Sequence, residues 1–194
     1  LQLIRFTSSS LGGSNIISGG PNPEPKEGFT IDPNQTYNLQ FDGGSRGNPG
    51  LSGAGMVIYN DKSQEVWNGS YLLPKEATNN EAEYTALVKG LQHARRLGIR
   101  HLAVQGDSNL IVMQITGRYK VKSQHLKPFH RDAVELRSAF STFEISHIPR
   151  EENGRADELA NIAMDSASCT NGIPQSSFET DWLEDSPSSI KNTP

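Results

Sequence analysis

Cysteine is almost absent from this chain of 194 residues, in which Cys169 is the only one. A single thiol cannot form an intramolecular disulfide, and it cannot supply the several ligands of a cysteine zinc site. One unpaired cysteine also fits a reducing compartment. We therefore expect an intracellular protein, with the cytoplasm as the first expectation and the nucleus or an organelle as alternatives.

Long hydrophobic runs are also absent. No apolar stretch approaches the roughly 20 residues that a membrane-spanning helix requires, so we expect no membrane partner. Hydrophobic residues make up only 34% of the chain, a low share that indicates segments outside the packed core. The length suits one domain with extensions at its ends, and we expect a monomer.

A strong excess of either charge is missing as well, although the net charge is −4. Residues 37–164 contain 15 basic and 14 acidic residues, whereas residues 165–194 contain one basic and five acidic residues. The negative charge therefore belongs to the C-terminal residues. If four acids of the central segment hold metal ions, the rest of its surface is basic by about five charges, which permits a nucleic-acid partner.

Composition divides the chain into three parts. Residues 1–36 and 166–194 are rich in small and polar residues without sustained periodicity, which predicts a flexible N-terminal extension and a flexible acidic C-terminal tail. Hydrophobic periodicity at residues 37–165 predicts a folded domain. Its expected elements, in chain order, are strands at 37–42, 53–59 and 64–72, a helix at 79–97, a strand at 100–105, helices at 108–116 and 125–139, a strand at 142–148 and a helix at 154–165. This order predicts an α/β fold with three antiparallel strands followed by parallel crossovers.

The segment FDGGSRGNPG at residues 41–50 is the most informative one. Tyr37, Leu39 and Phe41 alternate on one face of the expected strand, which places Asp42 on the polar face. We interpret Asp42 as the end of the strand and the following residues as a glycine-rich loop with bare N–H groups. A carboxylate beside such amides suits a metal ion and a phosphate or sugar backbone, but the same sequence also suits an ordinary β-hairpin.

Two glutamates compete for a functional role on the helix expected at 79–97. Thr78 and Glu81 have the spacing of a capping box, which favours a structural role for Glu81. Glu83 shares a helical face with Leu87 and Leu91. A carboxylate on the buried face of a helix is costly unless it is paired or bound to a metal, so Glu83 is the better candidate ligand.

Two aspartates follow at the ends of later elements. Asp107 lies at the carboxyl end of an expected strand, where open α/β sheets bind ligands. As an alternative, Asp107 or Ser108 could cap the next helix. Asp157 falls in the first or second turn of the final helix, after Asn153 as a candidate N-cap. There the helix dipole alone also favours an acidic residue.

Considered jointly, these acids have a shared explanation. Each of four carboxylates lies at the end of an element or on an inward face, and their elements can meet at one sheet: Asp42, Glu83, Asp107 and Asp157. Oxygen ligands of this kind suit Mg²⁺ or Mn²⁺ rather than zinc. Two such ions can activate a water and stabilise a leaving oxygen, which is the chemistry of phosphodiester hydrolysis.

The chain resembles type 1 ribonuclease H in four segments, which occur in that family's order and spacing across about residues 37–165: FDGGSRGNPG, TNNEAE, QGDSNL and HIPREENGRADELAN. The lack of a long basic insertion between the middle helices is similar to short bacterial, archaeal and plant-like members. The resemblance implies a ribonuclease H-like fold with a five-stranded mixed sheet. It also implies two Mg²⁺ ions, with Mn²⁺ as an alternative, held by Asp42, Glu83, Asp107 and Asp157.

The resemblance further implies how an RNA–DNA hybrid binds. In the family, the glycine-rich segment and nearby asparagines contact 2′-hydroxyls of the RNA strand, and the matching residues here are Gly43, Gly44, Asn48, Asn79, Asn80 and Asn109. Thr78 resembles a residue that helps to hold a phosphate of the DNA strand. A basic stretch could follow a phosphate backbone or be an ordinary solvated loop, and it comprises Arg118, Lys120, Lys122 and Lys127.

One auxiliary catalytic position stays open between two residues. Many relatives place a mobile histidine ten residues before the last aspartate, which corresponds to His147. Shorter members use an arginine seven residues before it, which corresponds to Arg150 and is our preferred assignment. His147 could instead end the strand expected at 142–148 and point inward.

We therefore expect an endonuclease that hydrolyses the RNA strand of RNA–DNA hybrids, leaves 5′-phosphate and 3′-hydroxyl ends and has little sequence specificity. Two other interpretations stay open. One is a non-catalytic hybrid-binding protein, which the loss of a carboxylate would favour. The other is an integrase-like or exonuclease-like enzyme on the same fold, in which the acids are arranged differently.

Overall fold

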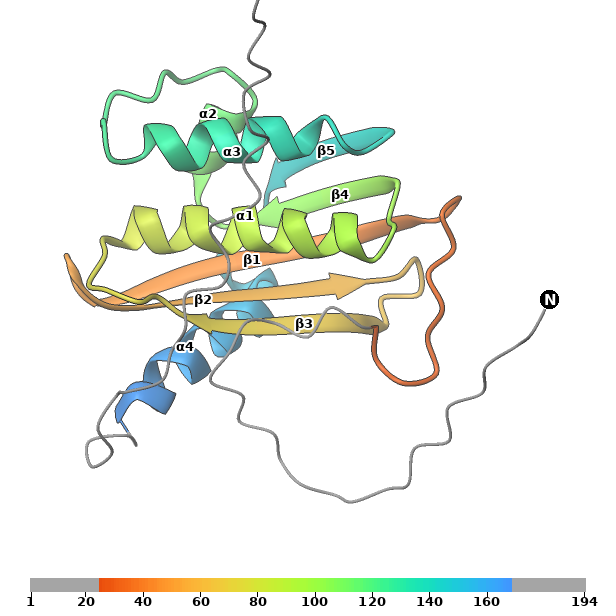
Figure 1. The fold of residues 1–194 in the computed structure, drawn as a ribbon, viewed down its shortest axis with the longest axis horizontal. Coiled ribbons are helices and arrows are strands. Elements are labelled where there is room, and N and C mark those ends of the chain that lie inside the picture. The colour runs from red at the N-terminus through yellow and green to blue at the C-terminus, as the bar shows by residue number, and fades with distance from the viewer. Residues whose placement is uncertain (1–24, 169–194) are drawn as a thin grey trace, which may run out of the picture.

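The structure is a computed structural model that describes residues 25–168. Its centre is one five-stranded sheet in the order β3–β2–β1–β4–β5 (Figure 1). The strands are β1 (Thr36–Gly47), β2 (Gly50–Tyr59), β3 (Glu65–Leu72), β4 (His101–Gly106) and β5 (Thr142–His147). Strands β1, β2 and β3 pair antiparallel, whereas β4 pairs parallel with β1 and β5 pairs parallel with β4. The expected mixed sheet, with three antiparallel strands followed by two parallel ones, is confirmed.

Helices cover both faces of this sheet. Helix α1 (Asn79–Arg96) lies across β1 and β2 and packs against α3 (Lys127–Arg137), and the short α2 (Asn109–Ile115) contacts α3 and β5. Helix α4 (Gly154–Ser168) lies on the opposite face against β2, β1 and β3, behind the sheet in Figure 1. A short 3-10 turn, η1 (Arg150–Glu152), precedes α4. Within residues 25–168, no helix has the length and apolar character to cross a membrane.

The main core lies between α1 and the sheet. Leu39 and Phe41 of β1 are at most 1% exposed, as are Leu87 and Leu91 of α1. Burial at this level stabilises a fold by about 1.5–3 kcal/mol for each large apolar side chain. A smaller cluster, which includes Leu159, lies under α4. The two clusters attach α1 and α4 to opposite faces of the sheet.

The strand that carries Asp42 is longer than predicted. Instead of ending at Asp42, β1 continues to Gly47, and β2 begins at Gly50. The predicted glycine-rich loop is therefore a β-hairpin, and Asp42 pairs with Gly55 within the ladder. The alternative interpretation as a β-hairpin is confirmed, and the prediction of a free loop was wrong because glycine also serves where another backbone comes close. The sequence alone does not show that helices approach this hairpin.

The packed part of the chain begins before the predicted boundary at residue 37. Phe29 and Ile31 pack against the main core, and the backbone N–H of Lys26 donates to the carbonyl of Val66 at 2.7 Å. These residues of the predicted N-terminal extension therefore contact the domain. The rest of that extension, and the predicted acidic tail from residue 169 onward, lie outside the described residues.

Candidate active site

Two glycines set how close the helices come to Asp42. Gly43 follows Asp42 in β1, and a Cβ there would lie 2.1 Å from the backbone nitrogen of Glu83. Gly55 pairs with Asp42 in the ladder, and a Cβ there would lie 2.0 Å from the carbonyl oxygen of Ala156. Because Cβ atoms do not come this close to backbone atoms, only glycine fits at either position. The turn of α1 that carries Glu83 and the first turn of α4 therefore lie directly against the strand around Asp42.

Asp42 is the most enclosed of the predicted carboxylates, with only 9% of its surface exposed. Its pKa is raised from 3.8 to about 7, first by burial and then by the charge of Asp107, and a backbone hydrogen bond from Gly43 only partly opposes this. The charges of Asp157 and Glu83 raise the pKa further. All three of the other predicted ligands therefore act on Asp42, as like charges that share one site do.

Glu83 is half-buried on α1. Its Oε1 accepts a hydrogen bond from Asn79 Nδ2 at 3.0 Å, whereas its Oε2 is buried and has no hydrogen-bond partner among the described residues. Burial raises the pKa of Glu83 from 4.5 to about 7, and the charge of Asp107 adds to this rise against hydrogen bonds from Ser108 and Asn79. A buried carboxylate oxygen without a donor is costly alone and well suited to a cation.

Glu81 has the structural role that its spacing predicts. Thr78 is the N-cap of α1, and its side chain accepts from the backbone nitrogen of Glu81 at 3.3 Å. The Glu81 carboxylate accepts in return from the backbone nitrogen of Thr78 at 2.8 Å, and this hydrogen bond lowers the pKa of Glu81. The predicted capping box is confirmed, and the Glu81 side chain is engaged in hydrogen bonds at the start of α1.

Asp107 follows the end of β4, as predicted, and it does not cap the next helix. The N-cap residue of α2 is Ser108, and no side-chain hydrogen bond caps this helix. The carboxylate of Asp107 instead accepts a hydrogen bond at Oδ1 from Nδ2 of Asn153, at 3.0 Å. Asp107 is therefore linked to the segment that leads into α4.

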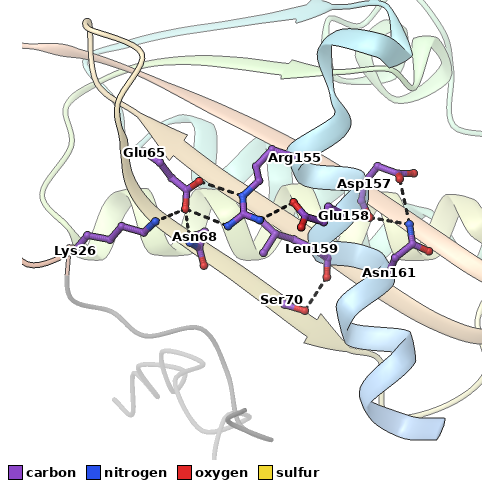
Figure 2. Close-up of polar contacts among 9 residues, drawn as sticks. All are labelled: Lys26, Glu65, Asn68, Ser70, Arg155, Asp157, Glu158, Leu159 and Asn161. Atoms are coloured by element: carbon purple, nitrogen blue, oxygen red, sulfur yellow. Dashed lines mark hydrogen bonds and ion pairs between the residues drawn. The ribbon is translucent and has the colours of Figure 1, made fainter. Parts of the chain in front are cut away.

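Asp157 lies in the first turn of α4, as predicted, and it accepts hydrogen bonds from two side chains. Arg150 donates to its Oδ1 at 3.0 Å, and Asn161 donates to its Oδ2 at 3.1 Å, a contact that Figure 2 shows. The Arg150 side chain is 78% exposed. Because exposed ion pairs are weak in water, Arg150 can leave this carboxylate at little cost.

A polar network anchors the first turns of α4 to β3 (Figure 2). Arg155 donates to Glu65 at 3.1 Å and to Glu158 at 2.7 Å, and Lys26 forms an ion pair with the same Glu65. Burial alone would raise the pKa of Glu65, but the hydrogen bonds from Arg155 and Lys26 lower it to about 2. The network therefore fixes the helix that carries Asp157 on the sheet.

Both candidates for the auxiliary catalytic position lie beside a predicted ligand. His147 ends β5, and its Nε2 lies 3.2 Å from the backbone carbonyl oxygen of Asp107. The interpretation in which strand alternation turns His147 inward is wrong, because the last two residues of the edge strand β5 are both exposed. Arg150 contacts the carboxylate of Asp157 instead. The structure thus brings both cationic residues to the site through different aspartates.

The asparagines predicted to contact a hybrid gather near the start of α1. Asn48 lies at the tip of the β1–β2 hairpin, and its Oδ1 accepts a hydrogen bond from the backbone nitrogen of Asn79 at 3.2 Å. Thr78 and Asn80 belong to the same helix start. Asn109 is exposed at the start of α2, two residues after Asp107, which follows the end of β4. Of this set, Asn79 contacts a predicted ligand directly, because its Nδ2 donates to Glu83.

The two glycines predicted to contact the hybrid have a different setting. Gly43 is buried and Gly44 is half-buried, and both lie within the ladder between β1 and β2. They do not lie on a free loop. Their backbone contact with a hybrid stays a prediction, whereas the close approach of α1 to Gly43 is a packing role that the sequence did not indicate.

The predicted basic stretch lies between α2 and the start of α3. Its four cations are exposed, and within residues 25–168 none of them takes part in an ion pair: Arg118, Lys120, Lys122 and Lys127. No acidic residue occurs between Asp107 and Asp132. This segment therefore offers uncompensated positive charge to solvent.

The four carboxylates fit a divalent ion that prefers oxygen ligands. Two of them have a pKa raised to about 7, and one keeps a buried oxygen without a donor. A nearby cation relieves both conditions, and Mg²⁺ or Mn²⁺ takes carboxylate oxygens. In the described part of the chain, however, no three His, Cys, Asp or Glu side chains are gathered closely enough to enclose an ion by themselves.

Sequence reasoning missed what the Asn153 side chain does. As expected of an N-cap position, Asn153 precedes α4 and its carbonyl accepts the N–H of Asp157 at 3.1 Å. Its side chain, however, donates to the carbonyl of Phe41 at 2.9 Å and to Asp107. No local pattern predicts a contact across 112 residues. Asn161 was also missed, although its position four residues after Asp157 on one helix was a usable signal.

Similarity to known proteins covers most of the described residues. The family model described as "Reverse transcriptase-like" matches residues 40–163. The bifunctional protein Rv2228c of Mycobacterium tuberculosis is 43% identical over 129 residues, and this match covers 66% of the chain and 35% of that protein. The chain thus spans about a third of the length of this curated relative.

Two further relatives match over most of their length. Ribonuclease HI of Halobacterium salinarum is 36% identical over 152 residues, which cover 78% of this chain and 76% of that protein. The crystal structure of LC11-RNase H1 in complex with RNA/DNA hybrid has 39% sequence identity and a TM-score of 0.65, and the match covers 68% of this chain and 99% of that one. On this fold, sequence identity and coverage, the chain belongs to the type 1 ribonuclease H family.

Proposed function

We propose that this protein is an endonuclease that hydrolyses the RNA strand of RNA–DNA hybrids and leaves 5′-phosphate and 3′-hydroxyl ends. The observation that carries the proposal is the close approach of α1 and α4 to the strand around the buried Asp42. The pKa of Asp42 is raised first by burial and then by the charges of the three other carboxylates, which agrees with this arrangement. Membership of the ribonuclease H family supports the reaction class. The relative LC11-RNase H1, solved with an RNA/DNA hybrid, supports the substrate.

We assign the ligands of two divalent ions to the four carboxylates: Asp42, Glu83, Asp107 and Asp157. When bound, the ions activate a water and stabilise the leaving oxygen of the phosphodiester. The chain's own part is to hold the carboxylate oxygens on four separate elements. Asn79 hydrogen-bonds to Glu83 for this purpose, and Asn153 hydrogen-bonds to Asp107.

Substrate contacts at this site favour sugar and phosphate over base edges. Side-chain amides can both donate to and accept from a 2′-hydroxyl, and the proposed set is Asn48, Asn79, Asn80 and Asn109. The backbone of Gly43 and Gly44 lines the same hairpin, and Thr78 would hold a phosphate of the DNA strand. The exposed cations of the basic stretch would follow a phosphate backbone. Low sequence specificity follows, because such contacts carry no base information.

We assign the auxiliary role to Arg150. Its exposed guanidinium can leave Asp157 and meet the phosphate charge of substrate or product. His147 lies beside a backbone carbonyl of Asp107, and within residues 25–168 it forms no ion pair with a carboxylate. Arg150→Ala should lower kcat by at least about tenfold, and His147→Ala should lower it less. Steady-state kinetics at saturating Mg²⁺ measure both variants, and the reverse order would contradict the assignment.

One gel assay tests the proposed function. Labelled RNA–DNA hybrid, double-stranded RNA and double-stranded DNA are each incubated with Mg²⁺, Mn²⁺ or EDTA. We expect cleavage of only the RNA strand of the hybrid, only with metal, and with the stated ends. Equal cleavage of either duplex, or cleavage that persists in EDTA, would contradict the proposal. Binding of the hybrid without any cleavage would favour a non-catalytic binding protein.

A matched pair of variants locates the activity. Asp42→Asn should abolish hybrid cleavage while circular dichroism remains that of the folded protein, because the change removes a ligand charge without changing the side-chain size. Asp132→Asn is the control, since that side chain is 47% exposed on α3 and pairs with the neighbouring Arg131. Near-normal cleavage by Asp42→Asn would contradict the assignment of the site.

A further inference from the structure

One buried asparagine joins the segments that carry three of the four carboxylates. Asn153 lies between η1 and α4 and is 0% exposed. Its Nδ2 donates to Oδ1 of Asp107 at 3.0 Å and to the carbonyl oxygen of Phe41, the residue before Asp42, at 2.9 Å. Its backbone carbonyl accepts the N–H of Asp157 at 3.1 Å. Asn153 therefore connects β1, the segment that follows β4 and the start of α4.

The two acceptors determine the orientation of this amide. A backbone carbonyl and a carboxylate both need a donor, so the nitrogen of Asn153 must face them and its oxygen must face away. That oxygen, Oδ1, is buried and has no hydrogen-bond partner within residues 25–168. Burying an unpaired amide oxygen is unfavourable. The unpaired oxygen of Asn153 therefore costs free energy of folding, while its NH₂ group donates to Asp107 and to the strand beside Asp42.

We propose that Asn153 is a positioning residue for divalent-ion binding: its amide holds the carboxylate of Asp107 at a fixed place relative to the β1 backbone next to Asp42. The inference rests on the proposed function of this site. Removing a hydrogen-bond partner of a metal ligand typically lowers metal affinity or activity about 10–100-fold. Because Asn153 is fully buried, its loss should act on metal affinity and turnover, and it should leave binding of the hybrid largely unchanged.

Ser70 provides the matched control. Its Oγ donates to the carbonyl of Leu159 at 2.7 Å, as Figure 2 shows. Ser70→Ala and Asn153→Ala therefore each remove side-chain hydrogen bonds between the sheet region and the α4 segment, but only Asn153 touches a carboxylate of the site. For both variants and the unchanged protein, isothermal titration calorimetry measures Mg²⁺ and Mn²⁺ binding without nucleic acid. Thermal unfolding in EDTA, and kcat and KM for the hybrid, complete the comparison.

The expected result separates the two variants. Asn153→Ala should bind Mg²⁺ at least about tenfold more weakly and show a matching fall in kcat, with KM for the hybrid within about twofold. Ser70→Ala should lose some thermal stability and keep its metal affinity within about twofold. If Asn153→Ala binds Mg²⁺ as tightly as the unchanged protein, or if both variants lose affinity equally, the positioning role is overturned.

A measurement on the unchanged protein covers the case in which Asn153→Ala does not fold. Two hydrogen bonds from one buried NH₂ group predict slow solvent exchange of the Asn153 side-chain protons in NMR spectra, and a shift of their resonances when Mg²⁺ is added. Fast exchange or an absent shift would overturn the proposal. Calorimetry and NMR use no hybrid, so they test Asn153 even if the protein cleaves no hybrid, a result that would refute only the proposed function.

Discussion

Two glutamates on α1 have different hydrogen-bond partners, and we therefore expect them to differ in function. The carboxylate of Glu81 accepts from both the backbone nitrogen and the hydroxyl of Thr78, each at 2.8 Å. Glu83, two residues later, faces inward with one buried oxygen that has no partner. The glutamate at position 81 therefore caps the helix, whereas the glutamate at position 83 has an oxygen available to a cation.

Exchanging each glutamate for glutamine separates these roles. Glu81→Gln keeps an oxygen that accepts from Thr78, so the free energy of unfolding should change by less than about 1 kcal/mol. Its cleavage rate should stay near that of the unchanged protein. Glu83→Gln should lower kcat by more than about 100-fold, beyond the effect typical of residues that only hydrogen-bond to ligands. Urea unfolding and steady-state kinetics measure both, and equal kinetic losses would refute the distinction.

His93 is a buried titratable residue away from the predicted ligands. It is 4% exposed, and its ring stacks on Trp67 with 4.7 Å between ring centroids. Burial, together with the charges of Arg96 and Lys89, lowers the pKa of His93 from 6.5 to about 4. The folded protein therefore keeps His93 neutral where the unfolded chain already binds a proton.

This pKa shift predicts a loss of stability in mild acid. Above pH 6.5 the contribution of His93 is fully present, and it is lost as the pH falls from 6.5 to about 4. At about 1.4 kcal/mol for each pH unit, the loss approaches about 3 kcal/mol. His93→Phe keeps a ring on Trp67 and should remove this part of the pH dependence. Urea unfolding of both proteins at pH 7, 5.5 and 4 measures it, and parallel curves would contradict the prediction.

At the scale of elements, backbone approach determines which carboxylates meet. Helix α1 packs against β1 at Gly43 on one face of the sheet, and α4 packs against β2 at Gly55 on the other face. A side chain at either position would separate a helix from the sheet by the thickness of a methyl group. The residues that bring the predicted ligands together are therefore partly residues with no side chain at all.

An alanine at Gly55 tests this close packing. Its methyl group would lie 2.0 Å from the carbonyl oxygen of Ala156 and must push α4 away from β2. Overpacking of this kind costs about 1–3 kcal/mol, and the shift of Asp157 should also reduce hybrid cleavage. Thermal unfolding and kinetics measure the two effects.

Gly154→Ala is the matched control for that change. A Cβ at this first residue of α4 meets nothing within 4 Å, and alanine favours a helix over glycine by up to about 1 kcal/mol. The control should therefore be at least as stable as the unchanged protein and equally active. A Gly55→Ala protein that matched it in both respects would show that α4 can move without consequence.

At the scale of the whole molecule, the proposed site places like charges where the sheet is covered from both faces. Mutual repulsion and burial of Asp42 and Glu83 oppose folding in the absence of a cation. The two buried clusters and the Glu65 network on α4 offset this cost. Binding of a cation at the carboxylates should therefore couple directly to global stability.

Metal addition and removal test that coupling. For each ion bound, Mg²⁺ at ten times its dissociation constant should stabilise the folded protein by about 1.4 kcal/mol, and at one hundred times by about 2.7 kcal/mol. Asp42→Asn should lose most of this increase. In EDTA the variant should unfold at a temperature no lower than the unchanged protein, because one buried charge is gone. Differential scanning calorimetry measures the four midpoints, and an equal Mg²⁺ shift in both proteins would contradict the assignment of Asp42.

Local spacing in the sequence was sufficient for the elements and for several site residues. Hydrophobic alternation and helical periodicity predict the strands, the helices and their order, and the antiparallel and parallel pairing follows from that order. The capping box of Thr78 and Glu81, and the positions of Asp107 and Asp157 at element ends, also depend only on neighbours along the chain. Features that depend only on neighbouring residues can therefore be predicted from a short stretch of sequence.

Only the tertiary structure decided how these parts meet. The approach of α1 to Gly43, the exposure of His147 and the contacts of the Asn153 side chain all depend on segments far apart in the chain. The physical reason is that an asparagine or a glycine has the same local preferences whether or not another backbone lies against it. The chain alone determined which residues are candidate ligands of a divalent ion, and packing across the sheet decided which side chains donate hydrogen bonds to these candidates.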